Sequence, residues 1–443
     1  MNQRQYLIKG TLFLTLAGLL TRIGGFFYKI FLSRTIGAKE IGLYQLTVPV
    51  LSLCMAVACG GIQTAISRFT AEYHAQKDSS AAKKILKYSL LYSGGLSVLC
   101  AVSIHQNASW IASNYLLEPS CEILLQIIAC SLPFAVTHAC ISGYFIGIKN
   151  ISVSAVSQLI EQLLRMGTAF LFYGLFQNTN RTMDARVMAL GQVAGELSSA
   201  LYCIYYLCYA KKHTDSSASF STSLTGCGAL KKVLSVSFPL GLNRILMCVL
   251  QSMEAALLPQ KLQHFGMTSH SALASYGTLT GMALPLILFP TALTSAISTL
   301  LLPTVSEAQA LHQDDKISIT VKTSIITSFS MGFCFLLAFL LYGTFIGTVL
   351  FESTEAGIYI QSLAWICPFL YLNTTLISVL HGIGKTSAVF VWNLLAFGIR
   401  LAAVIWAVPH LGIQGYLLGT IGSQFFLSCC ICFSLRQYLF SKV

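Results

Sequence analysis

Charged residues are scarce in this chain. Asp, Glu, Lys and Arg make up 9% of its 443 residues, whereas a soluble domain carries about 25%. Hydrophobic residues make up 55%, and the mean hydropathy is +0.72. The shortage of charge excludes a soluble globular domain and predicts an integral membrane protein. The apolar runs do not alternate with polar residues, so we expect helices rather than barrel strands.

Motifs for covalent or phosphate chemistry are also missing. The chain has no P-loop, no HExxH and no GxSxG sequence, which argues against ATP hydrolysis and covalent catalysis. We therefore expect no enzyme activity, no catalytic residue, no cofactor and no metal site. No basic stretch is interleaved with aromatic residues on a soluble module, so a nucleic-acid partner is not expected. The 15 cysteines are interpreted as small apolar packing residues.

Long apolar stretches fill most of the sequence. Reading for about 20 apolar residues per crossing predicts twelve membrane helices. Their approximate ranges are 7–32, 41–66, 88–111, 121–147, 151–176, 185–209, 232–258, 272–301, 321–350, 356–382, 387–408 and 412–435. Because Arg22 interrupts the first run and no cleavage site follows it, we interpret that run as a membrane helix and not as a signal peptide.

Basic residues are unevenly divided between the predicted loops. If the N-terminus is cytoplasmic, seventeen Lys and Arg lie in cytoplasmic segments and five lie in outer loops. The positive-inside rule then places both termini in the cytoplasm. Attraction to lipid head groups is the alternative interpretation of the loop charges.

The two halves of the chain resemble each other. Five identical pairs share one constant offset in the numbering: Glu72 and Glu307, Lys87 and Lys322, Pro133 and Pro368, Gly147 and Gly382, Arg165 and Arg400. Arg22 and Arg244 correspond at a somewhat smaller offset. We predict two six-helix bundles, residues 1–210 and 232–443, joined by a cytoplasmic linker at 211–231. An even number of helices per half predicts pseudo-twofold symmetry about an axis along the membrane normal.

Five basic side chains lie inside apolar runs: Arg22, Lys29, Arg165, Arg244 and Arg400. Only Glu161, Glu196 and Glu254 lie at comparable depth. A charge at the centre of a membrane helix costs about 2.5–3.5 kcal/mol on insertion scales, so a cationic surplus predicts a cavity for an anionic cargo. The alternatives are internal salt bridges, as between Glu161 and Arg165, and snorkelling of Lys29 to the interface.

Polar residues recur at helical spacing in three of the predicted helices. Arg22 shares a face with Lys29, Gln158 with Glu161 and Arg165, and Arg244 with Gln251. The stripes, together with the correspondence of Arg400 to Arg165 in the repeat, predict the substrate-binding residues Arg22, Lys29, Gln158, Glu161, Arg165, Arg244, Gln251 and Arg400. His138 and His381 also lie in apolar runs, and we interpret them as hydrogen-bonded packing residues and not as proton sites.

Several segments resemble one known family. The segments 21–29 (TRIGGFFYK), 32–37 (LSRTIG) and 42–46 (GLYQL), together with Ile66-Ser67-Arg68 and Glu72, resemble the stage V sporulation protein B group. That group belongs to the polysaccharide transporters of the MATE-like superfamily, which also holds the lipid II flippases. The resemblance implies a V-shaped pair of bundles around a central cavity. It also implies that Arg22 binds a pyrophosphate.

The same resemblance implies a cargo and a place in the cell. We expect a multi-pass protein of the bacterial plasma membrane. It would flip an undecaprenyl-pyrophosphate-linked saccharide, such as a peptidoglycan precursor, from the inner to the outer leaflet. Its partners would be the lipid-linked anionic saccharide and membrane lipids, and cell-wall synthesis enzymes would act downstream of a monomer. Many relatives carry two further C-terminal helices, which in lipid II flippases shape a groove for the lipid tail. The sequence ends at Val443, after the twelfth predicted helix, so neither a dedicated tail groove nor lipid II itself is expected.

Two rival functions stay open. A cation-coupled multidrug exporter of the MATE type would use a buried acid, yet no Asp occurs within any predicted span. A membrane-embedded glycosyltransferase or ligase would use carboxylates on large outer loops, and the predicted outer loops are short.

Overall fold

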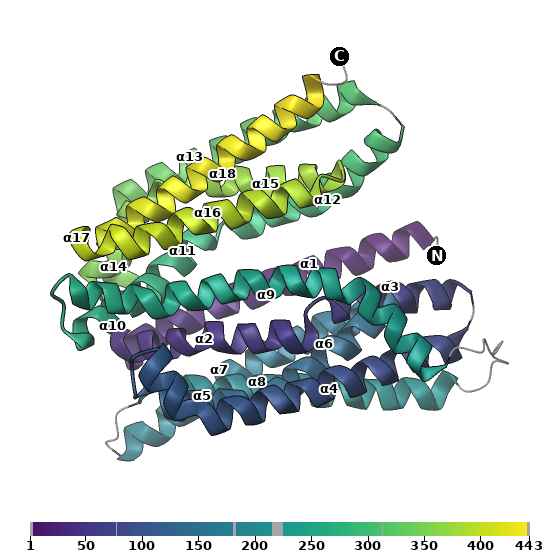
Figure 1. The fold of residues 1–443 in the computed structure, drawn as a ribbon, viewed down its shortest axis with the longest axis horizontal. Coiled ribbons are helices and arrows are strands. Elements are labelled where there is room, and N and C mark those ends of the chain that lie inside the picture. Colours follow the sequence, from purple (N-terminus) through teal and green to yellow (C-terminus); the bar gives the residue numbers. More distant parts are fainter. Residues whose placement is uncertain (1–2, 77, 180–182, 215–224, 312, 441–443) are drawn as a thin grey trace. The chain divides into compact units, whose positions relative to one another are not determined.

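The computed structural model describes residues 3–76, 78–179, 183–214, 225–311 and 313–440 (Figure 1). All regular elements in these ranges are helices, as the composition predicts. Lys77, Arg181 and Lys442, which enter the predicted charge division, lie outside the described residues, and so does the middle of the predicted linker, 215–224.

The chain divides into two compact units. Unit 1 comprises Met1–Tyr28 and Leu43–Met253, and unit 2 comprises Lys29–Gly42 and Glu254–Val443. The boundaries of these units do not coincide with the predicted linker at 211–231. The bundle boundaries at 210 and 232 therefore stay a prediction.

Unit 1 holds most of the first ten helical elements. They are α1 (Gln3–Thr35), α2 (Ala38–Cys59), α3 (Ile62–Ala75), α4 (Ser79–Trp110), η1 (Ile111–Tyr115), α5 (Cys121–Ala129), α6 (Leu132–Gly147), α7 (Ile151–Thr179), α8 (Ala185–Thr214) and α9 (Gly226–His264). Helices α1, α2 and α9 each run through a unit boundary. Buried side chains of α3, α4 and α6, such as Ile66, Ile85 and Ile141, form the core of this unit.

Unit 2 repeats this arrangement with its own elements. They are α10 (Ser269–Gly277), η2 (Thr278–Ala283), α11 (Leu284–Leu288), α12 (Thr291–Ala310), α13 (Asp314–Phe351), α14 (Thr354–Ala364), α15 (Cys367–Gly382), α16 (Thr386–Trp406), α17 (Val408–Leu411) and α18 (Ile413–Phe440). Its core gathers Val305, Ile317, Leu376 and Ile431 from α12, α13, α15 and α18.

The internal repeat is visible in the helix boundaries. Helices α4, α6 and α7 begin at positions 79, 132 and 151, and α13, α15 and α16 begin at positions 314, 367 and 386. The offset is the same for all three pairs, and it is the offset of the five identical pairs in the sequence. Packing repeats as well. Helix α6 contacts α3, α4 and α8, as α15 contacts α12, α13 and α18, and α7 pairs with α8 as α16 pairs with α18.

Two bends occur at equivalent places. The chain bends by 40° between α5 and α6 and by 57° between α14 and α15. Pro133 and Pro368 stand in the first positions of the helices that follow. Proline suits a helix start because it lacks the N–H that would be unsatisfied there. Each proline thus lies just after the bend within one predicted span.

The count of membrane helices is lower than predicted. Within the described residues, nine helices are long and apolar enough to cross a membrane, or up to eleven if each bent pair is one span. The chain is therefore a multi-pass membrane protein. Helix α7 has 29 residues but is not among those eleven. Gln158, Glu161, Gln162 and Arg165 lower its mean hydropathy. The count of twelve in two bundles stays a prediction.

Candidate functional site

A group of ionic side chains lies at the junction of α6, α7 and α8 in unit 1. Arg165 donates a hydrogen bond to Glu161, one turn earlier on α7, which confirms the predicted i,i+4 pair. Gly195 of α8 lets the two helices approach closely: a β-carbon at this position would lie 2.8 Å from the Glu161 carbonyl oxygen. Glu196, the next residue on α8, is thereby brought beside the α7 carboxylate.

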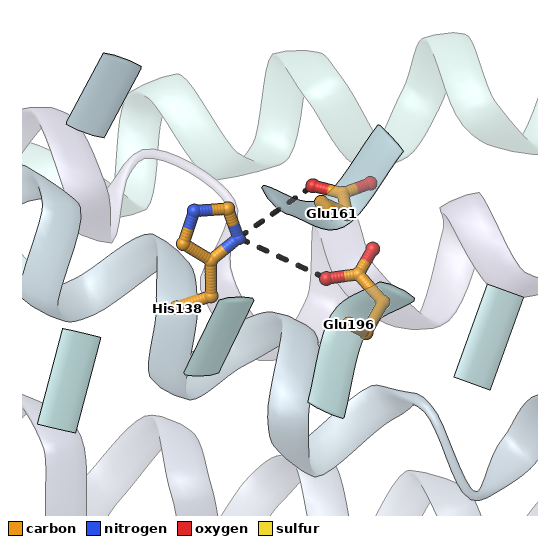
Figure 2. A group of neighbouring side chains, drawn as sticks. All are labelled: His138, Glu161 and Glu196. Atoms are coloured by element: carbon orange, nitrogen blue, oxygen red, sulfur yellow. Dashed lines mark ion pairs between the residues drawn. The ribbon is translucent and has the colours of Figure 1, made fainter. Parts of the chain in front are cut away.

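His138 of α6 points between the two carboxylates (Figure 2). Its Nδ1 atom lies 3.8 Å from a carboxylate oxygen of Glu161 and 3.8 Å from one of Glu196. Its Nε2 atom lies 2.9 Å from the Ser157 hydroxyl. The second oxygen of Glu196 accepts from Gln192 at 3.1 Å. The ligand atoms of His138, Glu161 and Glu196 all lie within 4.8 Å of one another, a spacing at which one cation could bridge them.

Unit 2 contains its own ion pair, between the buried Glu254 and the half-buried Arg400. Arg400 of α16 donates to a carboxylate oxygen of Glu254 at 2.7 Å, and the Tyr416 hydroxyl of α18 donates to the other oxygen at 2.9 Å. The Arg400 guanidinium also lies 4.1 Å from the centre of the Phe397 ring, within the range of a cation–π contact. Glu254 comes from α9, so its pairing with Arg400 joins residues 146 positions apart.

The remaining predicted site residues differ in exposure. Arg22 on α1 and Arg244 and Gln251 on α9 are exposed, whereas Lys29 and Gln158 are half-buried. Neither Arg22 nor Arg244 forms an ion pair with any carboxylate in the described part of the chain. The structure thus separates two neutralised arginines, Arg165 and Arg400, from two exposed ones.

Sequence reasoning misses three members of these clusters. It interprets His138 as a packing residue, counts Glu196 as a buried acid without a role, and does not consider Tyr416. A signal exists for Glu196, since it follows Gly195 and lies one turn after Gln192 on a polar helix face. No local pattern links His138 to either acid, because the three residues come from three helices.

One family model matches most of the chain. It is described as polysaccharide biosynthesis protein and matches residues 7–309. The chain belongs to this family. Stage V sporulation protein B of Bacillus subtilis (strain 168) is 27% identical over 426 residues, covering 94% of this chain and 81% of that protein. This match confirms the resemblance seen in segments 21–46. The lipid II flippase MurJ of the same organism is 25% identical over 168 residues, covering 36% of this chain and 31% of that protein.

Solved structures share the fold. An inward-facing multidrug resistance MATE family transporter of the MOP superfamily gives a TM-score of 0.73 at 14% identity, covering 96% of this chain and 95% of that one. Lipid II flippase MurJ in an inward closed conformation gives 0.72 at 15% identity, with coverages of 96% and 87%. At these identities the likeness shows a MATE-like helical fold and leaves the cargo open.

Proposed function

We propose that this protein is a flippase for an undecaprenyl-pyrophosphate-linked saccharide. It would move this cell-wall or polysaccharide precursor from the inner to the outer leaflet of a bacterial plasma membrane by alternating access. The family assignment and the similarity to a sporulation protein and a lipid II flippase support this class of cargo. None of these relatives is named as an enzyme, which agrees with a transport role.

The observation that carries the proposal is the state of Arg22 and Arg244. These residues are equivalent in the internal repeat, and both present exposed guanidinium groups without a carboxylate in the described structure. An uncompensated charge inside a bilayer faces water or an anion, because contact with hydrocarbon costs several kcal/mol. Guanidinium groups bind phosphate oxygens through paired hydrogen bonds, so a pyrophosphate is a fitting ligand for both.

The rest of the arrangement is proposed on the same basis. Helix α7 would be the twelfth membrane span, carrying a polar stripe toward the cargo path. Residues 1–210 and 232–443 would form the two bundles, with both termini in the cytoplasm, and a monomer would suffice. Lys29, Gln158, Gln251 and the two paired arginines would line the path that the saccharide takes. Cysteine labelling at the exposed Lys231 tests the topology, and labelling from outside the cell would refute it.

The central experiment measures lipid-linked precursor in each leaflet. Cells depleted of the protein should accumulate the precursor in the inner leaflet. Arg22→Ala and Arg244→Ala should each reduce translocation roughly tenfold to a hundredfold, since each removes charged hydrogen bonds worth about 1.5–3 kcal/mol apiece. Arg22→Lys should retain part of the activity, because lysine keeps the charge and loses the paired geometry.

Arg186→Ala is the matched control. Arg186 is an exposed arginine paired with Asp184 at 3.4 Å, outside the predicted binding residues, so its loss should leave translocation unchanged. Normal amounts of Arg22→Ala and Arg244→Ala protein in the membrane, with normal translocation, would reject pyrophosphate binding by these residues.

A second candidate is a cation-coupled multidrug exporter. The likeness to the MATE family transporter favours it, while the exposed cationic residues Arg22 and Arg244 oppose a cationic drug as cargo. Drug accumulation in the same depleted cells separates the candidates. Depletion of a flippase leaves drug accumulation unchanged, whereas depletion of an exporter raises it.

A further inference from the structure

The hydrogen bond between His138 and Ser157 is compatible with a neutral imidazole that carries its hydrogen on Nε2. The Ser157 hydroxyl donates its single hydrogen to the Ser154 carbonyl oxygen at 2.9 Å. A Ser157 hydroxyl engaged in this way can accept from His138, and the neutral imidazole then carries its hydrogen on Nε2. The Nδ1 atom then presents a lone pair, and Figure 2 shows it directed between Glu161 and Glu196. In this tautomer, three acceptors face one another: Nδ1 of His138 and the carboxylates of Glu161 and Glu196.

The charges around His138 do not balance. Helix α6 packs against α3, α4, α7 and α8. Among described residues, the ionic groups that face His138 are Glu161 from α7, beyond which lies Arg165, and Glu196 from α8. No charged side chain of α3 or α4 in the described ranges lies within ion-pair distance of the imidazole. With His138 neutral, two carboxylates oppose one guanidinium, which leaves one negative charge.

The residues of unit 2 that correspond to this cluster show which side chains are sufficient for helix packing. By the constant offset of the repeat, His138 corresponds to Asn373 and Glu161 corresponds to Ala396. Helices α8 and α18 begin at positions 185 and 413, a slightly smaller offset, by which Glu196 corresponds to Gln424. Asn373 donates to the side-chain oxygen of Gln424 at 3.0 Å. A neutral amide pair therefore satisfies the same helix contact, and the titratable groups of unit 1 exceed what packing requires.

We propose that His138, Glu161 and Glu196 form a proton-binding site. One proton from water adds to Nδ1 of His138 and is shared with the two carboxylates, which brings the cluster to zero net charge. A divalent metal would overshoot that balance and would lie beside the Arg165 guanidinium bonded to Glu161. If the protein is the proposed flippase, uptake of this proton from one side of the membrane and its release to the other couple translocation to a proton gradient.

The site is tested by NMR of ¹⁵N-histidine-labelled protein in lipid nanodiscs. One imidazole signal, absent from His138→Asn, should show hydrogen on Nε2 alone at high pH and on both nitrogens at lower pH. At the pH where wild-type His138 is half protonated, Glu196→Gln should reduce the protonated fraction to about a tenth or less, because it removes one of two opposing charges. His105→Asn, which removes an exposed histidine of α4, should change nothing.

The contradicting results are specific. A His138 signal that stays unprotonated on Nδ1 while other histidines titrate would overturn the site, and so would displacement of the proton by sodium or zinc at fixed pH. If His138→Asn does not fold, the double variant His138→Asn, Glu196→Gln takes its place, because it reproduces the amide pair of unit 2. The imidazole signal that is absent from this variant is then assigned to His138. Glu196→Gln alone still decides the outcome, since it retains the histidine.

Coupling is tested separately in the leaflet assay. An imposed proton gradient should change wild-type translocation several-fold. It should leave translocation by the double variant His138→Asn, Glu196→Gln unaffected. A wild-type protein that translocates precursor equally with and without the gradient would reject coupling and leave the proposed function intact. A wild-type protein that translocates no lipid-linked precursor would reject the proposed function, while the NMR titration still decides the proton site.

Discussion

Helices α6, α7 and α8 of unit 1 and helices α15, α16 and α18 of unit 2 have equivalent packing and different charges. Both sets hold an arginine on the middle helix, Arg165 in one and Arg400 in the other. Arg165 finds its carboxylate one turn away on its own helix, whereas Arg400 takes Glu254 from α9. The repeat therefore preserves the cation and the helix contacts, while the neutralising acid comes from a different place.

The difference extends to the neighbouring position. Unit 1 places a histidine between two acids, and unit 2 places Asn373 against Gln424. A neutral amide pair has a fixed set of donors and acceptors, so it holds helices together at any pH. The comparison therefore contrasts a neutral amide contact in unit 2 with a cluster of ionisable side chains in unit 1 at one position of the fold.

The largest expected effect comes from breaking the unit 2 ion pair. Glu254→Gln should destabilise the protein by about 3–5 kcal/mol, because Arg400 would be left as a buried charge without its partner. Glu161→Gln should cost less, about 1.5–3 kcal/mol, since Glu196 also acts on Arg165. Thermal unfolding of the purified variants in one detergent measures both.

The matched control is a double variant. Glu254→Gln combined with Arg400→Met removes both charges and should recover most of the lost stability, because replacing a buried pair with uncharged residues is often neutral. Equal losses of stability for Glu254→Gln and Glu161→Gln would mean that Arg400 and Arg165 depend equally on their paired carboxylates. The comparison between the two units would then fail.

Sequence reasoning predicts those features of this comparison that depend on neighbours along the chain. The internal repeat anticipates the equivalent helix starts and the equivalent places of Pro133 and Pro368. Helical spacing anticipates the contact between Glu161 and Arg165. Such features need only the period of one helix or the register of two similar segments, both of which are written in the sequence.

Features that depend on tertiary packing cannot be predicted in this way. Arg400 has no acid within reach on its own helix, and its partner Glu254 stands 146 residues away. His138, Glu161 and Glu196 converge only because α6, α7 and α8 pack together. The number of membrane helices is hard to count for a different reason, since the polar stripe that gives α7 its ionic residues also lowers its hydropathy.

Two equivalent glycines test the packing side of the comparison. A β-carbon at Gly147 would lie 2.7 Å from the Ser67 carbonyl oxygen, whereas one at Gly382 would lie 3.0 Å from Val305 and 3.1 Å from the Leu302 carbonyl oxygen. Gly147→Ala should therefore destabilise the protein by about 1–3 kcal/mol, and Gly382→Ala should cost less. Unfolding midpoints that rank the two variants in the opposite order would show that α6 and α15 differ in packing as well as in charge.

The smallest effects are expected at exposed ion pairs, one from each unit. Arg34 lies 3.5 Å from Glu352, and Arg186 lies 3.4 Å from Asp184. Exposed pairs contribute about 0–1 kcal/mol because water and salt screen them. Arg34 also donates to the carbonyl oxygens of Val349 and Leu350, so Glu352→Gln should leave it in place.

Glu352→Gln and Asp184→Asn should each shift the unfolding free energy by less than about 1 kcal/mol, and added salt should remove what difference remains. Unfolding at low and high ionic strength measures this directly. Similar small values for both variants would place the difference between the units in the less exposed ion pairs of Glu254 and Glu161. A loss at Glu352 comparable with that at Glu254 would instead mean that exposure does not govern the strength of these pairs, and the contrast drawn between buried and exposed charges would fail.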